Sequence, residues 1–231
     1  MAELLEYGIR SFDELLPPRL RKVLAELSVT REYADGELVH GRGDNKPGLS
    51  IVRSGAVRMC NFGTDGTAIT TAVLGPGQVF GEFTLLTDLP RTHDAIAIGE
   101  TTIDQVSGTA FARAAKNEPE LIRILATSTA MRLHATLELL DDFRRLPLPV
   151  LTAKLLLSMA PGSPGRATVE CSQTDLSTSL GVSRVSVGKV LKTLNAEGLV
   201  EQRYASIDIP SCRRLKDWIA ERDYLFRISS P

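Results

Sequence analysis

The chain has 231 residues, of which 43% are hydrophobic, and its formal net charge at pH 7 is -1. This length allows a sizeable buried core and exceeds the usual size of one domain, so we expect two domains. The small net charge does not predict a polyanionic partner or strong non-specific adhesion to nucleic acid. Any contact with nucleic acid therefore needs a local basic patch.

Cysteine usage and the first residues bear on the compartment. Cys60, Cys171 and Cys212 are far apart and odd in number, which suits reduced thiols better than a disulfide framework. The first ten residues lack a basic region followed by an apolar core, and no stretch approaches the roughly 20 apolar residues of a membrane span. We therefore predict a cytoplasmic protein without a membrane partner.

The first half of the chain carries helical and then β-strand patterns. Apolar residues from Phe12 to Leu27 fall on one broad side, which predicts short amphipathic helices. From Val29 to Val106, β-rich runs at 49–52, 56–59 and 68–74 alternate with glycine-containing turns. The turns are Asp35-Gly36, Gly43-Asp44, Ser54-Gly55, Asp65-Gly66 and Gly75-Pro76-Gly77. This spacing predicts an all-β sandwich or roll.

A long helix is predicted next, from a cap at Asn117 to about Leu146. Its mostly apolar stripe recurs every 3.5 residues on average, which is the period of a two-helix seam. The stripe comprises Ile122, Leu125, Thr129, Leu133, Thr136, Leu140 and Phe143. It predicts a dimerisation helix and a homodimer; the alternative is an ordinary helix packed on its own β-domain. Pro147 and Pro149 then predict a hinge.

Residues 172–198 fit a helix-turn-helix. Ser172 caps a first helix that runs to Leu180, with Asp175 at the capping-box position, and Gly181 supplies the turn. Ser183 caps the second helix. Residues of this second helix are expected to contact base edges or phosphates of double-stranded DNA, namely Ser183, Arg184, Val185, Ser186, Lys189 and Lys192.

A wing is predicted after the second helix, with strands at 199–202 and 206–209, ending in the basic run Cys212-Arg213-Arg214. Residues 161–231 hold ten Lys or Arg against eight Asp or Glu, whereas the rest of the chain holds seventeen against twenty. This difference favours DNA contact in the last segment. The alternative is a helical bundle with a solvated charged face.

A polar excursion of the β-region, from Phe80 to Thr92, holds a carboxylate and an arginine nine residues apart. Glu82 is suited to accept ribose hydroxyls, while Arg91, Thr92 and nearby backbone N–H groups are suited to a phosphate. The pair therefore fits a phosphorylated sugar. The alternative is a surface ion pair across a turn, worth only about 0–1 kcal/mol.

With these motifs the sequence resembles the cyclic-AMP receptor protein (Crp-Fnr) family of bacterial transcription regulators from about Phe12 to Leu215. The matching motifs are Asp35-Gly36-Glu37, Gly43-Asp44, Ile51-Val52-Arg53-Ser54-Gly55, Gly75-Pro76-Gly77, Phe80-Gly81-Glu82, Pro90-Arg91-Thr92 and Gly181-Val182-Ser183-Arg184. The resemblance implies that cAMP or cGMP binds at Gly81, Glu82, Arg91, Thr92 and Thr136. Glu82 would hold the ribose 2′-hydroxyl, Arg91 and Thr92 the cyclic phosphate, and Thr136 the base. A palindromic operator and contact with RNA polymerase are also implied.

Several residues depart from the family pattern. Leu137 stands where the receptor itself has a serine that reaches across the dimer, so the choice among cAMP, cGMP and another ligand stays open. His93 and Asp94 replace the residues usual after the arginine, with solvated loop residues as the plainer interpretation. Val185 and Lys189 stand where the receptor carries glutamate and arginine. A different half-site with weaker bidentate discrimination is therefore expected.

The predicted fold is α+β, with an effector-binding β-roll (jelly roll) at 1–117, a dimerisation helix at 118–146 and a winged helix-turn-helix at 147–231. The predicted function is a homodimeric, DNA-binding transcription regulator controlled by a cyclic nucleotide and without enzymatic activity. Two alternatives are an effector-independent regulator whose roll is only structural, and a regulator that senses another ligand.

A cupin-type enzyme is a third alternative, and it lacks a chemical basis in this sequence. The histidines, His40, His93 and His134, are dispersed, and no nucleophile–base–acid set is present. An iron–sulfur cluster lacks ligands because no cysteine precedes Cys60, and haem has only scattered candidate ligands. We therefore expect no metal and no iron–sulfur cluster.

Overall fold

The computed structural model describes residues 10–64, 66, 68–87, 89–160 and 164–223. They form two compact units, of which one ends at Ala135 and the other begins at Thr136, within the long helix α5 (Glu120–Arg145). Among these residues, no helix combines the length and apolar character that a bilayer crossing requires. The predicted α+β architecture is confirmed, and each unit is described by itself below.

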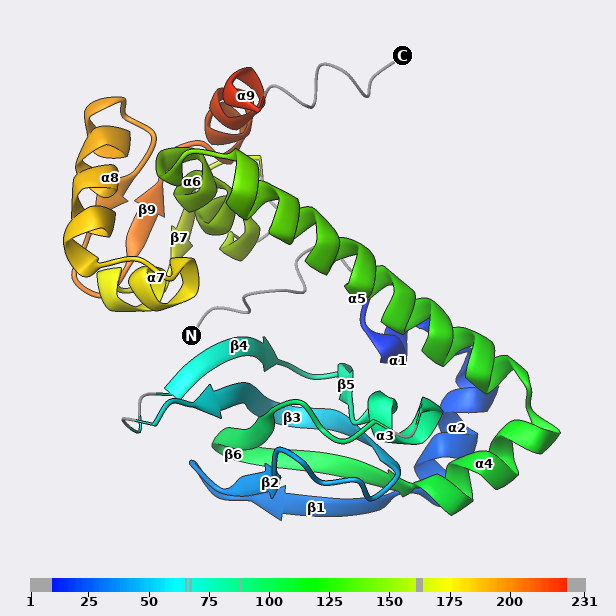
Figure 1. The fold of residues 1–231 in the computed structure, drawn as a ribbon. Coiled ribbons are helices and arrows are strands. Elements are labelled where there is room, and N and C mark those ends of the chain that lie inside the picture. The colour runs from blue at the N-terminus through cyan, green and yellow to red at the C-terminus, as the bar shows by residue number, and fades with distance from the viewer. Residues whose placement is uncertain (1–9, 65, 67, 88, 161–163, 224–231) are drawn as a thin grey trace. The chain divides into compact units, whose positions relative to one another are not determined.

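The unit up to Ala135 is a β-roll with short helices and the first part of α5 (Figure 1). All strand pairs are antiparallel; the main order is β1-β6-β3-β4, with β2 paired to β6 and β5 paired to β3. The strands are β1 (Val29–Tyr33), β2 (Leu38–His40), β3 (Gly48–Phe62), β4 (Ala68–Leu74), β5 (Val79–Phe80) and β6 (Asp94–Ser107). The helices are α1 (Phe12–Leu15), α2 (Pro18–Leu27), α3 (Glu82–Leu86) and α4 (Gly108–Asn117).

Strand β3 is one bent strand where the sequence predicted two strands and a turn. Its first half pairs with β5 and its second half with β4, and the register shifts around Ser54. Gly55, at φ +74°, lies at the bend, and a Cβ there would be 2.5 Å from the Glu100 carbonyl oxygen. The glycine therefore lets one long strand serve two parts of the roll, because a side chain would collide with β6.

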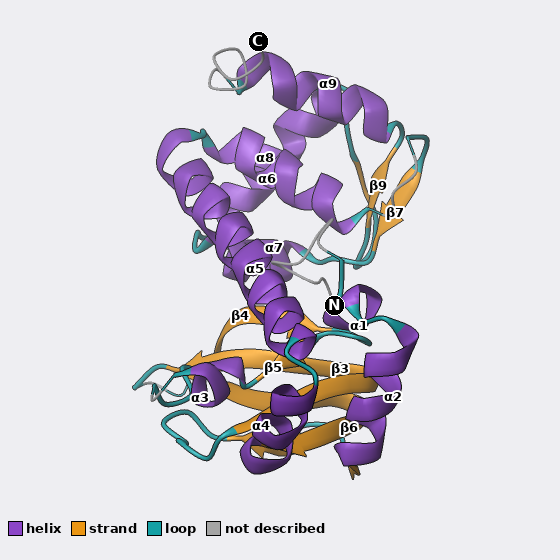
Figure 2. Ribbon diagram, turned by 90° about the vertical axis from the view of Figure 1, so that its right-hand side faces the viewer, coloured by secondary structure: helices purple, strands orange, loops and turns teal. Residues whose placement is uncertain are grey.

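The predicted start of the long helix at Asn117 is wrong, because Asn117 belongs to the preceding helix α4 and α5 begins at Glu120. Asn117 ends α4 instead of capping the next helix, and the Glu118 N–H donates to the Ala114 carbonyl (2.8 Å). Phe111 and Ala114 of α4 are buried with residues of α2 and of the first turns of α5. Together α2 and α4 lie at one end of the strands (Figures 1 and 2).

The stripe predicted for the dimer seam is also partly wrong. Leu125 is completely buried in the core of the β-roll unit, together with Leu121 and Ile124. The exposed apolar residues of α5 form a different row, comprising Ile122, Leu133, Leu137, Leu140 and Phe143, with Ala126 and Ala130 between the first two. Leu137, treated as a departure at a ligand position, belongs to this row.

The unit from Thr136 contains the predicted winged helix-turn-helix. Its core gathers apolar residues from every helix after α5, and a small antiparallel sheet has the order β7-β9-β8. The elements are α6 (Leu148–Met159), β7 (Ala167–Val169), α7 (Gln173–Leu180), α8 (Arg184–Ala196), β8 (Glu201–Gln202), β9 (Ile207–Ile209) and α9 (Cys212–Arg222). Cys212-Arg213-Arg214 begins helix α9, so this run does not end the wing as predicted. All three cysteines are buried free thiols, and burial raises the pKa of Cys171 to about 11.

Ion pairs to two buried carboxylates join the end of α5 to α6 and to the end of α9. Arg145 pairs with Asp142 and Asp223, and Lys154 of α6 contacts the same two carboxylates. Asp223 is only 1% exposed, and hydrogen bonds and charge from Arg145 and Lys154 hold its pKa below the usual value against the opposing effect of burial. The last turn of α5 is therefore fixed to the helix-turn-helix unit.

Candidate functional site

The first candidate site lies in the β-roll, around the glycine that precedes helix α3. Gly81 has a φ of +94°, and a Cβ there would lie 2.5 Å from Arg91 Nη1 and 2.6 Å from the Gly48 carbonyl oxygen. Only glycine fits, because the Arg91 guanidinium packs directly beside its backbone. Gly81 and Arg91, which the sequence predicted to share a site, are brought together.

Glu82 begins helix α3 and is 5% exposed. Its carboxylate pairs with a residue that the sequence analysis missed: Arg132 of α5, whose Nη2 lies 2.8 Å from Glu82 Oε1. Arg132 Nη1 also donates to the Val79 carbonyl (2.8 Å). One signal was available, since Arg132 precedes Thr136 by one helical turn and such residues share a helix face.

Arg91 is a buried cation short of partners. It is 8% exposed, and its backbone is held by the turn at Gly43-Asp44 through two hydrogen bonds of 2.8 and 2.9 Å. In the described part of the chain its side chain forms no ion pair, and its Nε is buried without a hydrogen-bond partner. Burial lowers the pKa of Arg91, whereas the charges of Asp44 and Glu82 raise it. An anionic ligand would relieve this cost.

His40 lies close enough to Arg91 to sense its charge. The ring is 2.9 Å from Ser50 Oγ and packs edge-on against Phe80, with ring centroids 5.6 Å apart. Burial, reinforced by the Arg91 charge, lowers the pKa of His40 to about 4. His40 is therefore neutral at pH 7, and the positive charge at this place in the roll belongs to Arg91.

Thr92 is exposed, and His93 holds its hydroxyl: Thr92 Oγ1 lies 2.8 Å from His93 Nδ1. The other ring nitrogen, Nε2, lies 2.9 Å from Thr71 Oγ1 on strand β4. His93 therefore bridges two threonines, which the sequence did not predict. Thr136 is an exposed residue of α5 in the other compact unit, so its role beside Glu82 and Arg91 stays a prediction.

The second candidate site is built on helices α7 and α8. The predicted capping box at Ser172 and Asp175 is present, with bonds of 2.8 and 3.1 Å, and Gly181 ends α7 at φ +64°. Ser183 caps α8 by accepting from the Ser186 N–H (3.1 Å). The inner face of α8 is buried, comprising Val187, Val190, Leu191 and Leu194.

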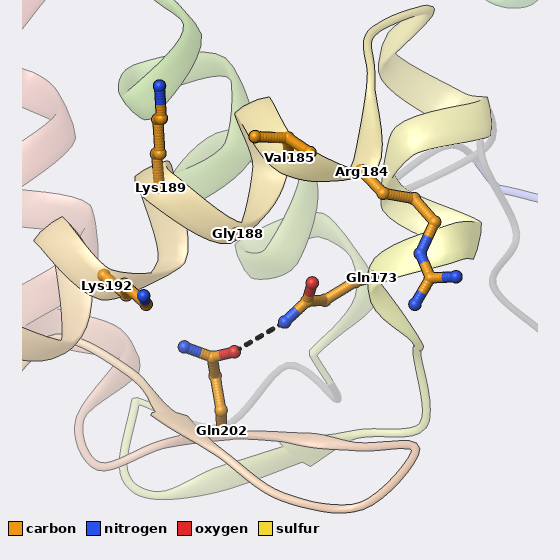
Figure 3. Close-up of a pocket in the computed structure, with 7 residues that line it drawn as sticks. All are labelled: Gln173, Arg184, Val185, Gly188, Lys189, Lys192 and Gln202. Carbon is orange, nitrogen blue, oxygen red and sulfur yellow. Dashed lines mark hydrogen bonds between the residues drawn. The ribbon is translucent and has the colours of Figure 1, made fainter.

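The outer face of α8 borders an open hollow of about 610 Å³ (Figure 3). The hollow is lined by Gln173, Arg184, Val185, Gly188, Lys189, Lys192 and Gln202. Three of these residues are cations and none is acidic, so the lining is electropositive. Gln173 Nε2 donates to Gln202 Oε1 (2.9 Å) and thereby connects the start of α7 to the wing. Of these lining residues, the sequence predicted Arg184, Val185, Lys189 and Lys192, but not Gly188 or the two glutamines.

The wing is braced by Asp208, whose carboxylate accepts from Arg166 (2.7 Å), Arg203 (3.1 Å) and Thr168 (2.8 Å). Hydrogen bonds from Arg166 and Thr168 lower the pKa of Asp208 to about 2. Tyr204, at the tip, is fully exposed. A braced wing with an exposed tip beside a recognition helix suits contact with a DNA backbone.

Two family models match the two units. The cyclic nucleotide-binding domain matches residues 30–118, and the Crp-like helix-turn-helix domain matches residues 152–218. Among the described residues, no group of three or more His, Cys, Asp or Glu side chains is arranged to hold a metal ion.

Relatives of known role cover most of the chain. The HTH-type transcriptional regulator Cmr of Mycobacterium tuberculosis is 31% identical over 187 residues, covering 80% of this chain and 74% of Cmr. The cyclic AMP receptor protein of Thermus thermophilus is 30% identical over 189 residues, covering 81% of this chain and 86% of the relative. A CRP/FNR-family transcriptional regulator, also of Thermus thermophilus, has a similar structure, with a TM-score of 0.67 and 22% identity over 84% of this chain and all of that one.

The fold, the electropositive helix-turn-helix and these likenesses define a DNA-binding transcription regulator with a cyclic nucleotide-binding domain. The chain belongs to the Crp-Fnr family.

Proposed function

We propose that this protein is a homodimeric regulator whose DNA binding is controlled by a cyclic nucleotide, cAMP or cGMP, in the β-roll. The observation that carries the proposal is Arg91, a buried cation without an ion pair in the described residues, packed beside the backbone of Gly81. A cyclic phosphate is one negative charge with acceptor oxygens, which matches this guanidinium. The Thermus relative is a cyclic AMP receptor, which agrees with this ligand class.

Glu82 supplies the second contact in this proposal. Its carboxylate is positioned by Arg132, and its oxygens offer acceptors for a ribose 2′-hydroxyl. Arg132 belongs to α5, and a ligand on Glu82 therefore acts on this helix directly. Thr92 adds a hydroxyl to the phosphate and Thr136 a contact to the base. The further end of α5 is fixed to the helix-turn-helix unit through Arg145, which gives the signal a continuous route.

The dimer is proposed from the exposed apolar row on α5. Leu133, Leu137 and Leu140 are 58%, 54% and 48% exposed, which is unusual for leucines on one side of one helix. Their spacing of four and three residues suits a two-helix seam. The proposed division keeps the roll at 1–117, the dimerisation helix at 118–146 and the DNA-binding domain at 147–231.

On DNA, α8 is proposed to read one half-site of a palindromic operator in the major groove. Arg184 suits a guanine, through O6 and N7, and Val185 suits a thymine methyl group. Lys189 and Lys192 add positive charge for phosphates or a base edge, while Ser183 and Ser186 place hydroxyls at the helix N-terminus, where phosphates bind. RNA polymerase as a partner and a cytoplasmic location complete the proposal.

Calorimetric titration of the full-length protein with cAMP and with cGMP tests the ligand. We expect saturable binding of at least one nucleotide, with one site per chain. If neither nucleotide binds, the regulator is effector-independent or senses another ligand, and the proposal is wrong on this point.

Sedimentation of the wild type and of Leu137→Asp tests the seam. A dimeric wild type and a monomeric variant are expected, because a charge in the seam would be buried without a partner. A wild type that sediments as a monomer contradicts the proposed homodimer.

A further inference from the structure

His93 has a place in the β-roll that neither the family pattern nor the ligand contacts explain. It directly follows Thr92, whose hydroxyl is assigned to the phosphate, and its ring connects that hydroxyl to Thr71 on strand β4. The ring is partly buried and both nitrogens are engaged. It is therefore positioned by the fold and is not a solvated loop residue, which was the plainer interpretation of the sequence.

The chemistry of imidazole makes this bridge sensitive to protons. A neutral ring has one N–H donor and one acceptor nitrogen, so one of the two threonines must donate its hydroxyl proton to the ring. A protonated ring donates from both nitrogens, and both hydroxyl protons become free for other acceptors. The Thr92 hydroxyl then donates to a phosphate oxygen without losing its hydrogen bond to the ring. The imidazolium also adds a positive charge beside the anion.

We infer that His93 couples cyclic-nucleotide binding to proton uptake, so that the ligand binds more tightly to the protein in which His93 is protonated. The inference rests on the proposed function, because it needs an anionic ligand at Arg91 and Thr92. It adds a regulation that depends on this chain's own histidine: the same nucleotide concentration occupies more of the regulator when the pH falls.

The groups around the His93 ring determine how nucleotide affinity changes with pH and over which pH range. Burial lowers the pKa of His93, with a further decrease from Arg42 in the turn after β2 and an opposing increase from Asp94 on β6. The free protein therefore holds the ring neutral near pH 7, and a bound phosphate raises the pKa. Affinity must rise as the pH falls through the pKa of the complex, and it levels off below the pKa of the free protein. In the free protein His40, with a pKa of about 4, is neutral across this range.

Calorimetry of the full-length protein with cAMP and cGMP at about pH 6 and about pH 8 tests the inference. The wild type is expected to bind more tightly at the lower pH, by up to about tenfold for each unit that the phosphate adds to the His93 pKa. Runs in two buffers of different ionisation enthalpy must show proton uptake on binding. His93→Gln keeps hydrogen-bonding capacity but does not titrate, so both effects are expected to disappear. His134→Gln, which removes a histidine of α5, is the matched control and keeps both effects.

Thr71→Val guards against a His93 variant that fails to fold. It removes only the second partner of the ring. We expect nucleotide binding to persist, while the pH at which the affinity changes differs from that of the wild type. Equal wild-type affinity at both pH values, or an unchanged pH effect in His93→Gln, overturns the inference and leaves the proposed function standing. Failure of both nucleotides to bind at either pH overturns the two together.

Discussion

The proposed ligand site in the β-roll and the proposed DNA-facing surface of α8 use arginine in opposite ways. Arg91 is 8% exposed and lacks a recorded ion pair among the described residues, whereas Arg184 is exposed at the border of an open hollow. A buried cation binds one small anion of defined shape with high energy. Exposed cations on a helix bind an extended polyanion with many weak contacts, each screened by salt. The difference agrees with the proposal that the β-roll binds the effector and that α8 contacts DNA.

The largest effect is expected from Arg91→Met in the proposed ligand site. We expect nucleotide binding to weaken by at least about 100-fold, near 3 kcal/mol, because the buried phosphate would lose its countercharge. The ligand-free protein should not become less stable, since the substitution removes a buried charge that lacks a direct partner. Calorimetry and thermal melting measure the two quantities. Arg123→Met, on the exposed side of α5, is the control and should change neither. A large loss of stability without nucleotide would show that Arg91 is structural.

Arg132→Met tests an arginine of the same site that does form an ion pair. It leaves the Glu82 carboxylate buried without its ion pair, so the free energy of unfolding should fall by about 3 kcal/mol. The double variant with Glu82→Gln should recover part of this loss, because the unpaired charge is gone. Urea denaturation of the four proteins measures the coupling. Additive effects would contradict a direct link between α3 and α5.

On the DNA-facing surface, single substitutions should cost less. Arg184→Ala is expected to weaken operator binding by about 1–3 kcal/mol and to relax the preference at one base pair. Lys192→Ala should weaken binding to all sequences alike and lower the salt dependence by about one phosphate contact. Lys216→Ala, exposed on α9 and outside the hollow, is the control. If Arg184→Ala weakens all sequences equally, α8 does not read bases through this residue.

The smallest expected effect concerns the cap of α8. Ser183→Ala removes the acceptor of the Ser186 N–H and should lower the free energy of unfolding by about 1 kcal/mol. DNA affinity should fall as well, since the start of the helix would fray. Urea denaturation and operator binding measure both, with Lys192→Ala as a control for stability. An unchanged stability would mean that the cap bond contributes nothing in solution.

The same comparison explains what the sequence could predict. The proposed DNA-facing surface lies on one short helix. Helix periodicity alone therefore separates the buried Val187 and Leu191 from the exposed Arg184 and Lys189. The ligand site joins segments that are far apart in the chain. Glu82 and Arg91 were found by their chemistry, but the contribution of Arg132 depends on how α5 packs against the roll.

Other elements were missed for physical reasons of the same kind. The bend at Gly55 exists because the backbone of β6 passes close by, which no local pattern encodes. Leu125 was assigned to the seam because its spacing fits both the seam and the core, and only packing decides between them. The basic run that begins helix α9 was predicted to end the wing, and no helix was predicted there, although the buried Leu215 and Trp218 of α9 complete the core of the helix-turn-helix unit.

The most direct test of the account is operator affinity measured with and without cAMP and cGMP, for the wild type and for Arg91→Met. If Arg91 is the phosphate contact of a working switch, a nucleotide raises the affinity of the wild type and leaves that of the variant unchanged. Wild-type affinity that is high and indifferent to both nucleotides would contradict control through the β-roll by this class of ligand.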